Sequence, residues 1–157
     1  MIQRIQSIWL LAAALVLLGL FIFPFVNYID LVGLGKRIFV TGVFSSVNNE
    51  SVQESSNVLL TIGSAFVAIF PLFIIFLFKN RKLQQLCVLA SIVSVVLLAV
   101  WLYASANSSL SAISLSLKPS NIGVGFFLLP VAIILLVMAL NGIKSDEKLI
   151  KSADRLR

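Results

Sequence analysis

Residues 122–143 read IGVGFFLLPVAIILLVMALNGI and contain no charged side chain. A helix that crosses about 30 Å of hydrocarbon needs about 20 mostly apolar residues, and this stretch meets that requirement. Outward from it along the chain lie three further uncharged stretches of similar length, at residues 7–26, 58–78 and 83–104. The sequence therefore predicts an all-α membrane protein, built as a bundle of four transmembrane helices.

The composition of the whole chain agrees with this prediction. Of its 157 residues, 60% are hydrophobic and only 11% are charged, and the mean hydropathy is +1.09. A soluble domain carries roughly 25% charged residues, and a small one leaves about a third of its unfolded surface exposed, so a soluble enzyme is excluded. With no histidine and one cysteine, the chain has no His/Cys metal site, Ser-His-Asp triad or internal disulfide. We expect no cofactor.

The positions of Lys and Arg predict the orientation in the membrane. Short loops rich in these residues tend to stay in the cytoplasm. Most of them lie near the N-terminus, after residue 143, or in the link between the second and third spans, which carries Lys79, Arg81 and Lys82. Both termini are therefore expected in the cytoplasm, with residues 27–57 and 105–121 as outer loops. We interpret the net charge of +6 as an attraction to anionic lipid headgroups rather than to nucleic acid.

No Asp, Glu, Lys or Arg lies inside the expected spans, which argues against a proton pump, an ion-coupled transporter or a charge-lined channel. Small and mildly polar residues one turn apart predict close packing and interhelical hydrogen bonds between the second and third spans. These residues are Thr61, Ser64, Ala68, Ala90 and Ser94. Pro24, Pro71 and Pro130 are expected to bend their helices, and for Pro71 and Pro130 packing is favoured over a hinge role.

The first outer loop contains strand-forming residues around a turn-like Gly33–Lys36 segment. We expect a hairpin that pairs residues near Ile29–Val32 with Arg37–Thr41. Ser109–Leu117 alternates apolar residues with serines and is expected to add a third strand, giving a small outer β cap. Ser45–Ser56 is polar and serine-rich, which predicts a mobile segment.

The last residues, 144–157, read KSDEKLIKSADRLR and predict a short amphipathic helix. Ser145 is the expected N-cap, with Asp146 and Glu147 in the first turn, where the helix dipole favours negative charge. The basic residues are the candidate contacts for a protein partner or anionic lipid: Lys144, Lys148, Lys151, Arg155 and Arg157. Three alternatives stay open, since this tail either lies on the membrane surface, docks on a protein or only holds the topology.

Three segments carry a family resemblance: the start MIQRIQSIWLLAAAL, the central link KNRKLQQLC and the end KSDEKLIKSADRLR. Together they resemble the four-pass membrane family catalogued as domain of unknown function 4293 (DUF4293), found in Bacteroidota. The resemblance covers the whole chain and implies four helices in a bacterial inner membrane. It implies no activity, substrate or cofactor.

For function, we favour a non-catalytic membrane component that binds a membrane or cytoplasmic protein partner through its basic tail or its outer cap. The alternative is a small pore or carrier formed by homo-oligomerisation. An enzyme ranks third, because the spans supply no acid, base or metal ligand.

Overall fold

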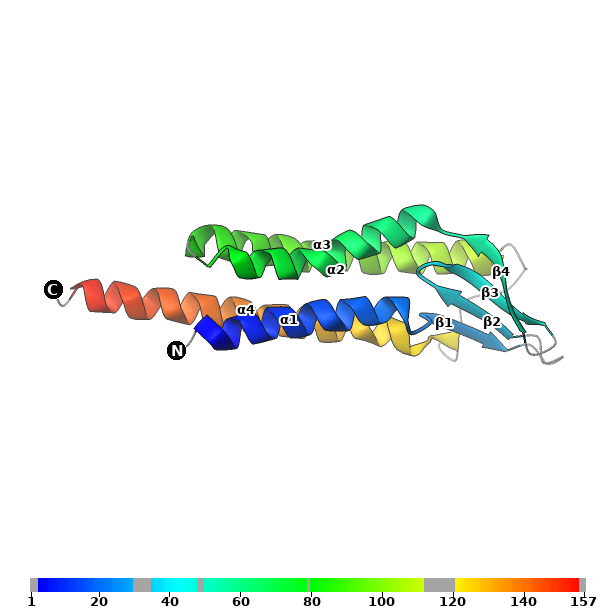
Figure 1. The fold of residues 1–157 in the computed structure, drawn as a ribbon, viewed down its shortest axis with the longest axis horizontal. Coiled ribbons are helices and arrows are strands. Elements are labelled where there is room, and N and C mark those ends of the chain that lie inside the picture. Colours follow the sequence, from blue (N-terminus) through cyan, green and yellow to red (C-terminus); the bar gives the residue numbers. More distant parts are fainter. Residues whose placement is uncertain (1–2, 30–34, 48–49, 79, 112–120, 156–157) are drawn as a thin grey trace.

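The computed structural model describes residues 3–29, 35–47, 50–78, 80–111 and 121–155. They form a long helical bundle with a small sheet at one end (Figure 1). The helices are α1 (Gln3–Leu18), extended by the 3-10 turn η1 (Gly19–Phe21), α2 (Val58–Phe76), α3 (Arg81–Ser111) and α4 (Val124–Arg155). The protein is thus mostly helical, as predicted.

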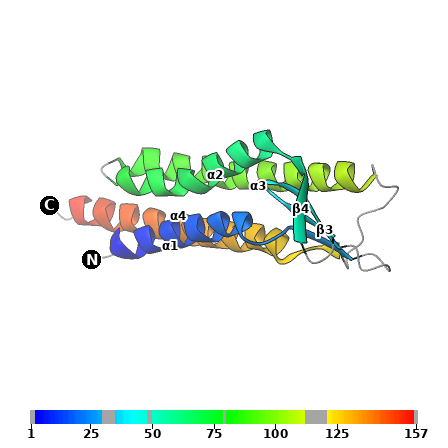
Figure 2. The same ribbon diagram turned by 45° about the vertical axis from the view of Figure 1, so that its right-hand side comes forward.

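The four helices pack as a ring, in which α1 contacts α2 and α4, and α3 contacts the same two helices. Figures 1 and 2 show the α1–α4 pair lying beside the α2–α3 pair, with both chain ends far from the sheet. Side chains such as Leu17, Leu102 and Leu136 are fully buried in the centre. Large apolar side chains also cover the outside, including Ile62, Phe66 and Phe73 of α2, which are each at least 60% exposed. A surface of this kind suits hydrocarbon rather than water.

Within the described part of the chain, three helical stretches are long and apolar enough to cross a membrane: Val58–Phe76, Arg81–Ser111 and Val124–Lys148. The apolar helical stretch formed by α1 and η1, Gln6–Phe21, is shorter. The helix ends before Pro24, so the expectation that Pro24 bends a span is wrong. The chain leaves the helix there because Phe25 donates its backbone N–H to the Ile38 carbonyl at 3.0 Å and so begins the sheet.

The sheet is an antiparallel meander in the order β1-β2-β3-β4. Its strands are β1 (Val26–Ile29), β2 (Gly35–Phe39), β3 (Gly42–Val47) and β4 (Glu50–Ser56). The expected hairpin exists, but with Val26 opposite Ile38 and Ile29 opposite Gly35, so its first strand begins earlier than predicted. Ile38 of β2, Val43 of β3 and Val40 of the turn between them join the bundle core.

Two expectations about the cap were wrong. Ser45–Ser56, predicted to be mobile, supplies the end of β3 and all of β4. Backbone pairing between β3 and β4 holds this segment in the sheet, and such pairing needs no apolar side chain. Ser109–Ser111, predicted to start a strand, is the last part of helix α3, and residues 112–117 lie outside the described residues. Among the described residues, the sheet therefore has four strands, all of which lie between Val26 and Ser56.

Backbone hydrogen bonds hold the sheet against the helix ends. Gly123 donates its N–H to the Phe25 carbonyl at 2.9 Å, and Gly125 donates to the Pro24 carbonyl at 3.0 Å. The Thr61 hydroxyl donates to the Val40 carbonyl at 3.2 Å, which joins the start of α2 to the sheet. The sheet and the bundle are therefore connected at the starts of both α2 and α4.

Candidate functional site

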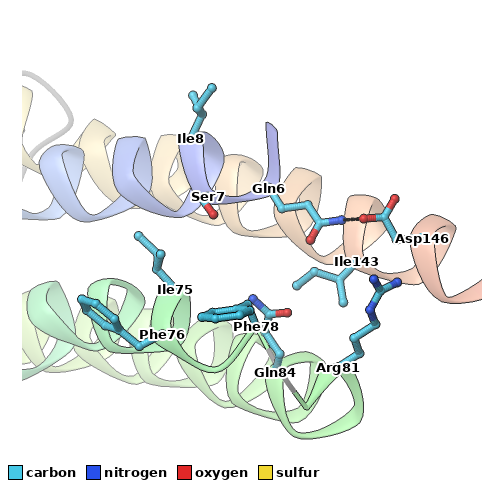
Figure 3. A pocket seen from close by; sticks show the side chains of 10 residues that line it. All are labelled: Gln6, Ser7, Ile8, Ile75, Phe76, Phe78, Arg81, Gln84, Ile143 and Asp146. Carbon is cyan, nitrogen blue, oxygen red and sulfur yellow. Dashed lines mark hydrogen bonds between the residues drawn. The ribbon is translucent and has the colours of Figure 1, made fainter. Parts of the chain in front are cut away.

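A cavity of about 670 Å³ lies at the end of the bundle opposite the sheet, and all four helices contribute to its walls (Figure 3). The link between α2 and α3 closes one side. The residues that line it are Gln6, Ser7, Ile8, Ile75, Phe76, Phe78, Arg81, Gln84, Ile143 and Asp146. It is the candidate functional site because it combines buried charge with an apolar opening.

The α4 side of the cavity carries a buried carboxylate. Asp146 is only 6% exposed, and its Oδ2 accepts a hydrogen bond from Nε2 of Gln6 on α1 (Figure 3). The other oxygen, Oδ1, is buried and has no hydrogen-bond partner among the described residues. A buried carboxylate oxygen without a partner is costly, so this atom favours an added donor.

The α3 side carries a cation. The guanidinium of Arg81 points from α3 toward α4, and its Nη1 is buried without a hydrogen-bond partner in the described part of the chain (Figure 3). Arg81 and Asp146 border the same cavity but form no ion pair with each other. Gln84, also of α3, lines the cavity beside Phe78 (Figure 3); it is 5% exposed and donates its Nε2–H to the Ile74 carbonyl at 3.4 Å. The site thus offers one unused donor and one unused acceptor.

The remaining wall is apolar and open. Ile8 of α1, Phe76 of α2 and Phe78 of the link are 59%, 76% and 52% exposed. They surround a mouth at the ends of helices whose outer faces are themselves apolar. This arrangement fits an amphipathic ligand, whose polar part faces Arg81 and Asp146 while its apolar part lies along the phenylalanines.

Comparison with known proteins assigns the family. The profile described as "Domain of unknown function (DUF4293)" matches residues 2–156. The chain belongs to the DUF4293 family. No curated protein and no solved structure matches it.

In this DUF4293 protein, the basic tail is not a separate element. Helix α4 runs without a break through Ser145, so the predicted N-cap at that residue is wrong. Lys144 and Lys148 are exposed on α4, whereas the side chains of Lys151 and Arg155, and all of Arg157, lie outside what the structure describes. The contact role of these basic residues stays a prediction.

The acidic residues of the tail contact the rest of the bundle. Glu147 accepts a hydrogen bond from Nε2 of Gln85 on α3, at 2.6 Å, and Asp146 contacts α1 through Gln6. Of the basic residues in the link between α2 and α3, Lys82 is exposed, Arg81 lines the cavity and Lys79 lies outside the described residues. The sequence thus singled out Arg81 as a basic residue of the link that sets the orientation, whereas the structure places it in the wall of the cavity.

The predicted packing residues lie in varied places. Ser64 and Ala68 are buried on α2, while Ala90 is exposed on α3. The hydroxyls of Ser64 and Ser94 donate to carbonyls of their own helices, those of Leu60 and Ala90, so the hydrogen bonds expected between helices are not made by these hydroxyls. Their packing role stays a prediction.

Helices α2 and α3 do contact each other, and Gly63 of α2 lies close to Trp101 of α3. A Cβ added there would lie 2.9 Å from the Trp101 ring. A spacing pattern of small residues does not reveal this position, because the partner of Gly63 is a large aromatic side chain on the other helix.

Sequence reasoning also missed Gln6, Gln84 and the cavity role of Asp146. Asp146 was interpreted as a first-turn residue of a surface helix. The one available signal is that Gln6 and Gln84 are uncharged polar residues at the ends of apolar stretches. That signal does not say which helices lie side by side.

Proposed function

We propose that this DUF4293 protein is a non-catalytic accessory subunit that crosses the bacterial inner membrane four times and presents its sheet to a protein partner outside the cytoplasm. In this proposal α1 is the fourth span, both termini are cytoplasmic, and no cofactor is needed. The apolar outer faces of the helices support a membrane position. The two chain ends lie at the same end of the bundle, which an even number of crossings requires (Figure 1).

The observation that carries the partner role is the edge of the sheet at β4. Among the described residues, β4 pairs with β3 on one side and with no strand on the other. Its residues Val52, Gln53 and Glu54 are all exposed. An edge strand offers backbone donors and acceptors that a strand from a partner can pair with.

The direction of these backbone groups follows from one contact. The hydroxyl of Ser45 on β3 lies 3.4 Å from the Val52 carbonyl, so this carbonyl faces β3. In an antiparallel pair, neighbouring residues of a strand face opposite sides. The backbone N–H and C=O of Gln53 therefore face away from the sheet and are available to a partner.

The edge is favoured over the basic tail as the main contact surface. The start of the tail is held within the bundle through Asp146 and Glu147, whereas β4 has a whole free side in the described structure. The charged edge residue Glu54 pairs with Lys36 at 2.8 Å, which disfavours unspecific strand pairing and favours a specific partner.

The test uses Gln53→Pro. Proline removes the outward N–H of an edge strand without removing a hydrogen bond to β3, so the sheet should still form. A photo-crosslinker at Ser55 of the full chain, followed by mild detergent extraction, should capture a companion in a fixed ratio. We expect Gln53→Pro to reduce this capture at least about tenfold, since the outward hydrogen bond is lost and the proline ring obstructs the approach of a partner strand.

Gln53→Thr, which keeps the backbone donor, is the matched control and should capture normally. Unchanged capture by Gln53→Pro, in a protein with unchanged circular dichroism, would show that the edge is not the contact surface. Crosslinking of the chain only to its own copies, together with ion conduction in liposomes, would favour the pore formed by homo-oligomerisation.

A further inference from the structure

We propose that the cavity between Arg81 and Asp146 binds the headgroup of a phospholipid that carries both a phosphate and a primary ammonium group, as a phosphoethanolamine lipid does. This inference rests on the membrane position proposed above, but not on the partner role of β4. It assigns the site a ligand class from three features: an unpaired buried acceptor, an unpaired buried donor and an apolar mouth.

The unpaired acceptor, Oδ1 of Asp146, favours a ligand group that is both cationic and a hydrogen-bond donor. Asp146 is more than nine-tenths buried, and its Oδ1 has no partner among the described residues. Gln6 supplies a neutral N–H to the other oxygen but no compensating charge. A buried carboxylate is stabilised by a cation that can also donate hydrogen bonds, and a primary ammonium has three N–H donors.

The unpaired donor, Nη1 of Arg81, favours an anionic ligand group. Arg81 is the first residue of α3, where the helix dipole adds positive potential, and its Nη1 is buried without a partner in the described structure. Guanidinium groups bind phosphate oxygens through charge-assisted hydrogen bonds. Because Arg81 forms no ion pair with Asp146, an occupant that carries both charges can satisfy both residues at once.

The mouth selects a lipid over a soluble molecule. Phe76 and Phe78 line the cavity and are more than half exposed at the end of apolar helices. In the proposed membrane position, this is where headgroups meet hydrocarbon, so an acyl chain leaving the cavity would lie along these rings. A volume of about 670 Å³ is enough for a headgroup and the start of its chains.

Related headgroups fit less well. A choline group carries the same charge but has no N–H to donate to Asp146 Oδ1. A phosphoglycerol group has no cation, so its phosphate adds negative charge beside a buried carboxylate. The expected order of affinity is therefore ethanolamine first, with choline and glycerol lipids weaker.

Native mass spectrometry of the full-length protein in detergent can test this order, with the three phospholipids added separately and with identical acyl chains. We expect the ethanolamine lipid to bind at least about tenfold more tightly than the choline lipid, as a hydrogen bond to a charged group predicts. Equal binding of the two would overturn the proposal.

Soluble phosphoethanolamine should bind at least about tenfold more weakly than the lipid, and equal binding would overturn the lipid assignment.

Two variants assign the contacts. Asp146→Asn keeps an oxygen for Gln6 but loses the charge, so it should remove the preference for ethanolamine over choline. Arg81→Gln should weaken all three lipids, because all three carry a phosphate. Lys82→Gln removes a neighbouring exposed charge, and Glu54→Gln removes a carboxylate at the sheet, so both should bind lipids normally. Unchanged binding by Asp146→Asn and Arg81→Gln would contradict the assignment.

Failure of the headgroup assignment can be distinguished experimentally from failure of the proposed function. Gln53→Pro should bind lipid normally, and flotation with choline-lipid vesicles tests membrane insertion alone. If flotation and partner capture succeed but the headgroup preference is absent, this inference fails and the proposed function stands. If flotation fails, the membrane position fails instead.

Discussion

Gly123 shows how a single residue permits the sheet to contact the bundle. A Cβ added at this position would lie 2.3 Å from the Pro24 carbonyl oxygen and 3.0 Å from the backbone of Phe25. Both atoms belong to the rigid connection between η1 and β1, and Gly123 donates its own N–H to Phe25. The missing side chain therefore allows the start of α4 to approach the start of the sheet.

We expect Gly123→Ala to destabilise the protein by about 1 to 3 kcal/mol, because backbone must move to admit the methyl group. In a chain of this size, that corresponds to a fall in Tm of several degrees, roughly 2 to 4 °C per kcal/mol. Thermal unfolding in detergent measures it. Gly19→Ala is the control, since its Cβ would lie 3.1 Å from the flexible end of Leu128 and in ordinary contact with the Phe23 ring at 3.8 Å, and would meet no backbone atom. An equal Tm for both variants would contradict this account.

Helix α4 illustrates what changes at the scale of an element. The charge pattern of residues 144–157 suggested an independent helix with its own N-cap, but α4 is continuous from Val124 to Arg155. The preceding apolar helix already supplies the hydrogen-bonded turn on which the tail extends, so no new nucleation is needed. Asp146 and Glu147 are then placed by their position on the bundle rather than by a helix dipole.

Substitutions at the exposed Ser145 distinguish a continuous helix from a capped one. Within a continuous helix, Ser145→Ala should leave stability unchanged or raise it by about 0.5 kcal/mol, and Ser145→Gly should lower it by roughly 0.5 kcal/mol. If Ser145 were an N-cap, the order of stability of the two variants would be reversed. Ser145→Ala would then lower the stability by about 1 kcal/mol and Ser145→Gly by only a few tenths of a kcal/mol. Thermal unfolding of the two variants gives the order directly, and a less stable alanine variant would contradict a continuous α4.

At the scale of the whole molecule, the sheet and the cavity lie at opposite ends of the bundle (Figures 1 and 3). In the proposed membrane position, the β4 edge faces outward and the Arg81–Asp146 cavity faces the inner leaflet. The two proposed binding surfaces are then separated by the length of the helices, and each can be tested without disturbing the other.

Thiol labelling can test this arrangement in a Cys87→Ser background. In sealed spheroplasts, a membrane-impermeant maleimide should label Ser55→Cys on β4 but label Lys148→Cys on α4 only after permeabilisation. A cysteine added before Met1 should behave as Lys148→Cys does. If it is labelled together with Ser55→Cys, α1 does not cross the membrane and the four-span proposal is wrong. Leu97→Cys, on the apolar face of α3, is the control for a position in hydrocarbon and should remain unlabelled.

The amino-acid sequence by itself determined the apolar helices α2, α3 and α4, the presence of strands between α1 and α2, and the family. Each of these depends on residues close together in the chain, since hydropathy over a span is a local sum and a family profile is read along the sequence. The membrane character follows from the same local property, because hydrocarbon selects uncharged helices whatever their neighbours are.

Only the tertiary structure decided the fourth strand, the continuity of α4 and the cavity. β4 is polar and is held by backbone pairing with β3, which side-chain composition does not report. Gln6 and Asp146 are 140 residues apart and meet only because α1 packs against α4. Which helices lie side by side is settled by packing over their whole length, so a site built from the ends of four helices is not visible in any single one of them.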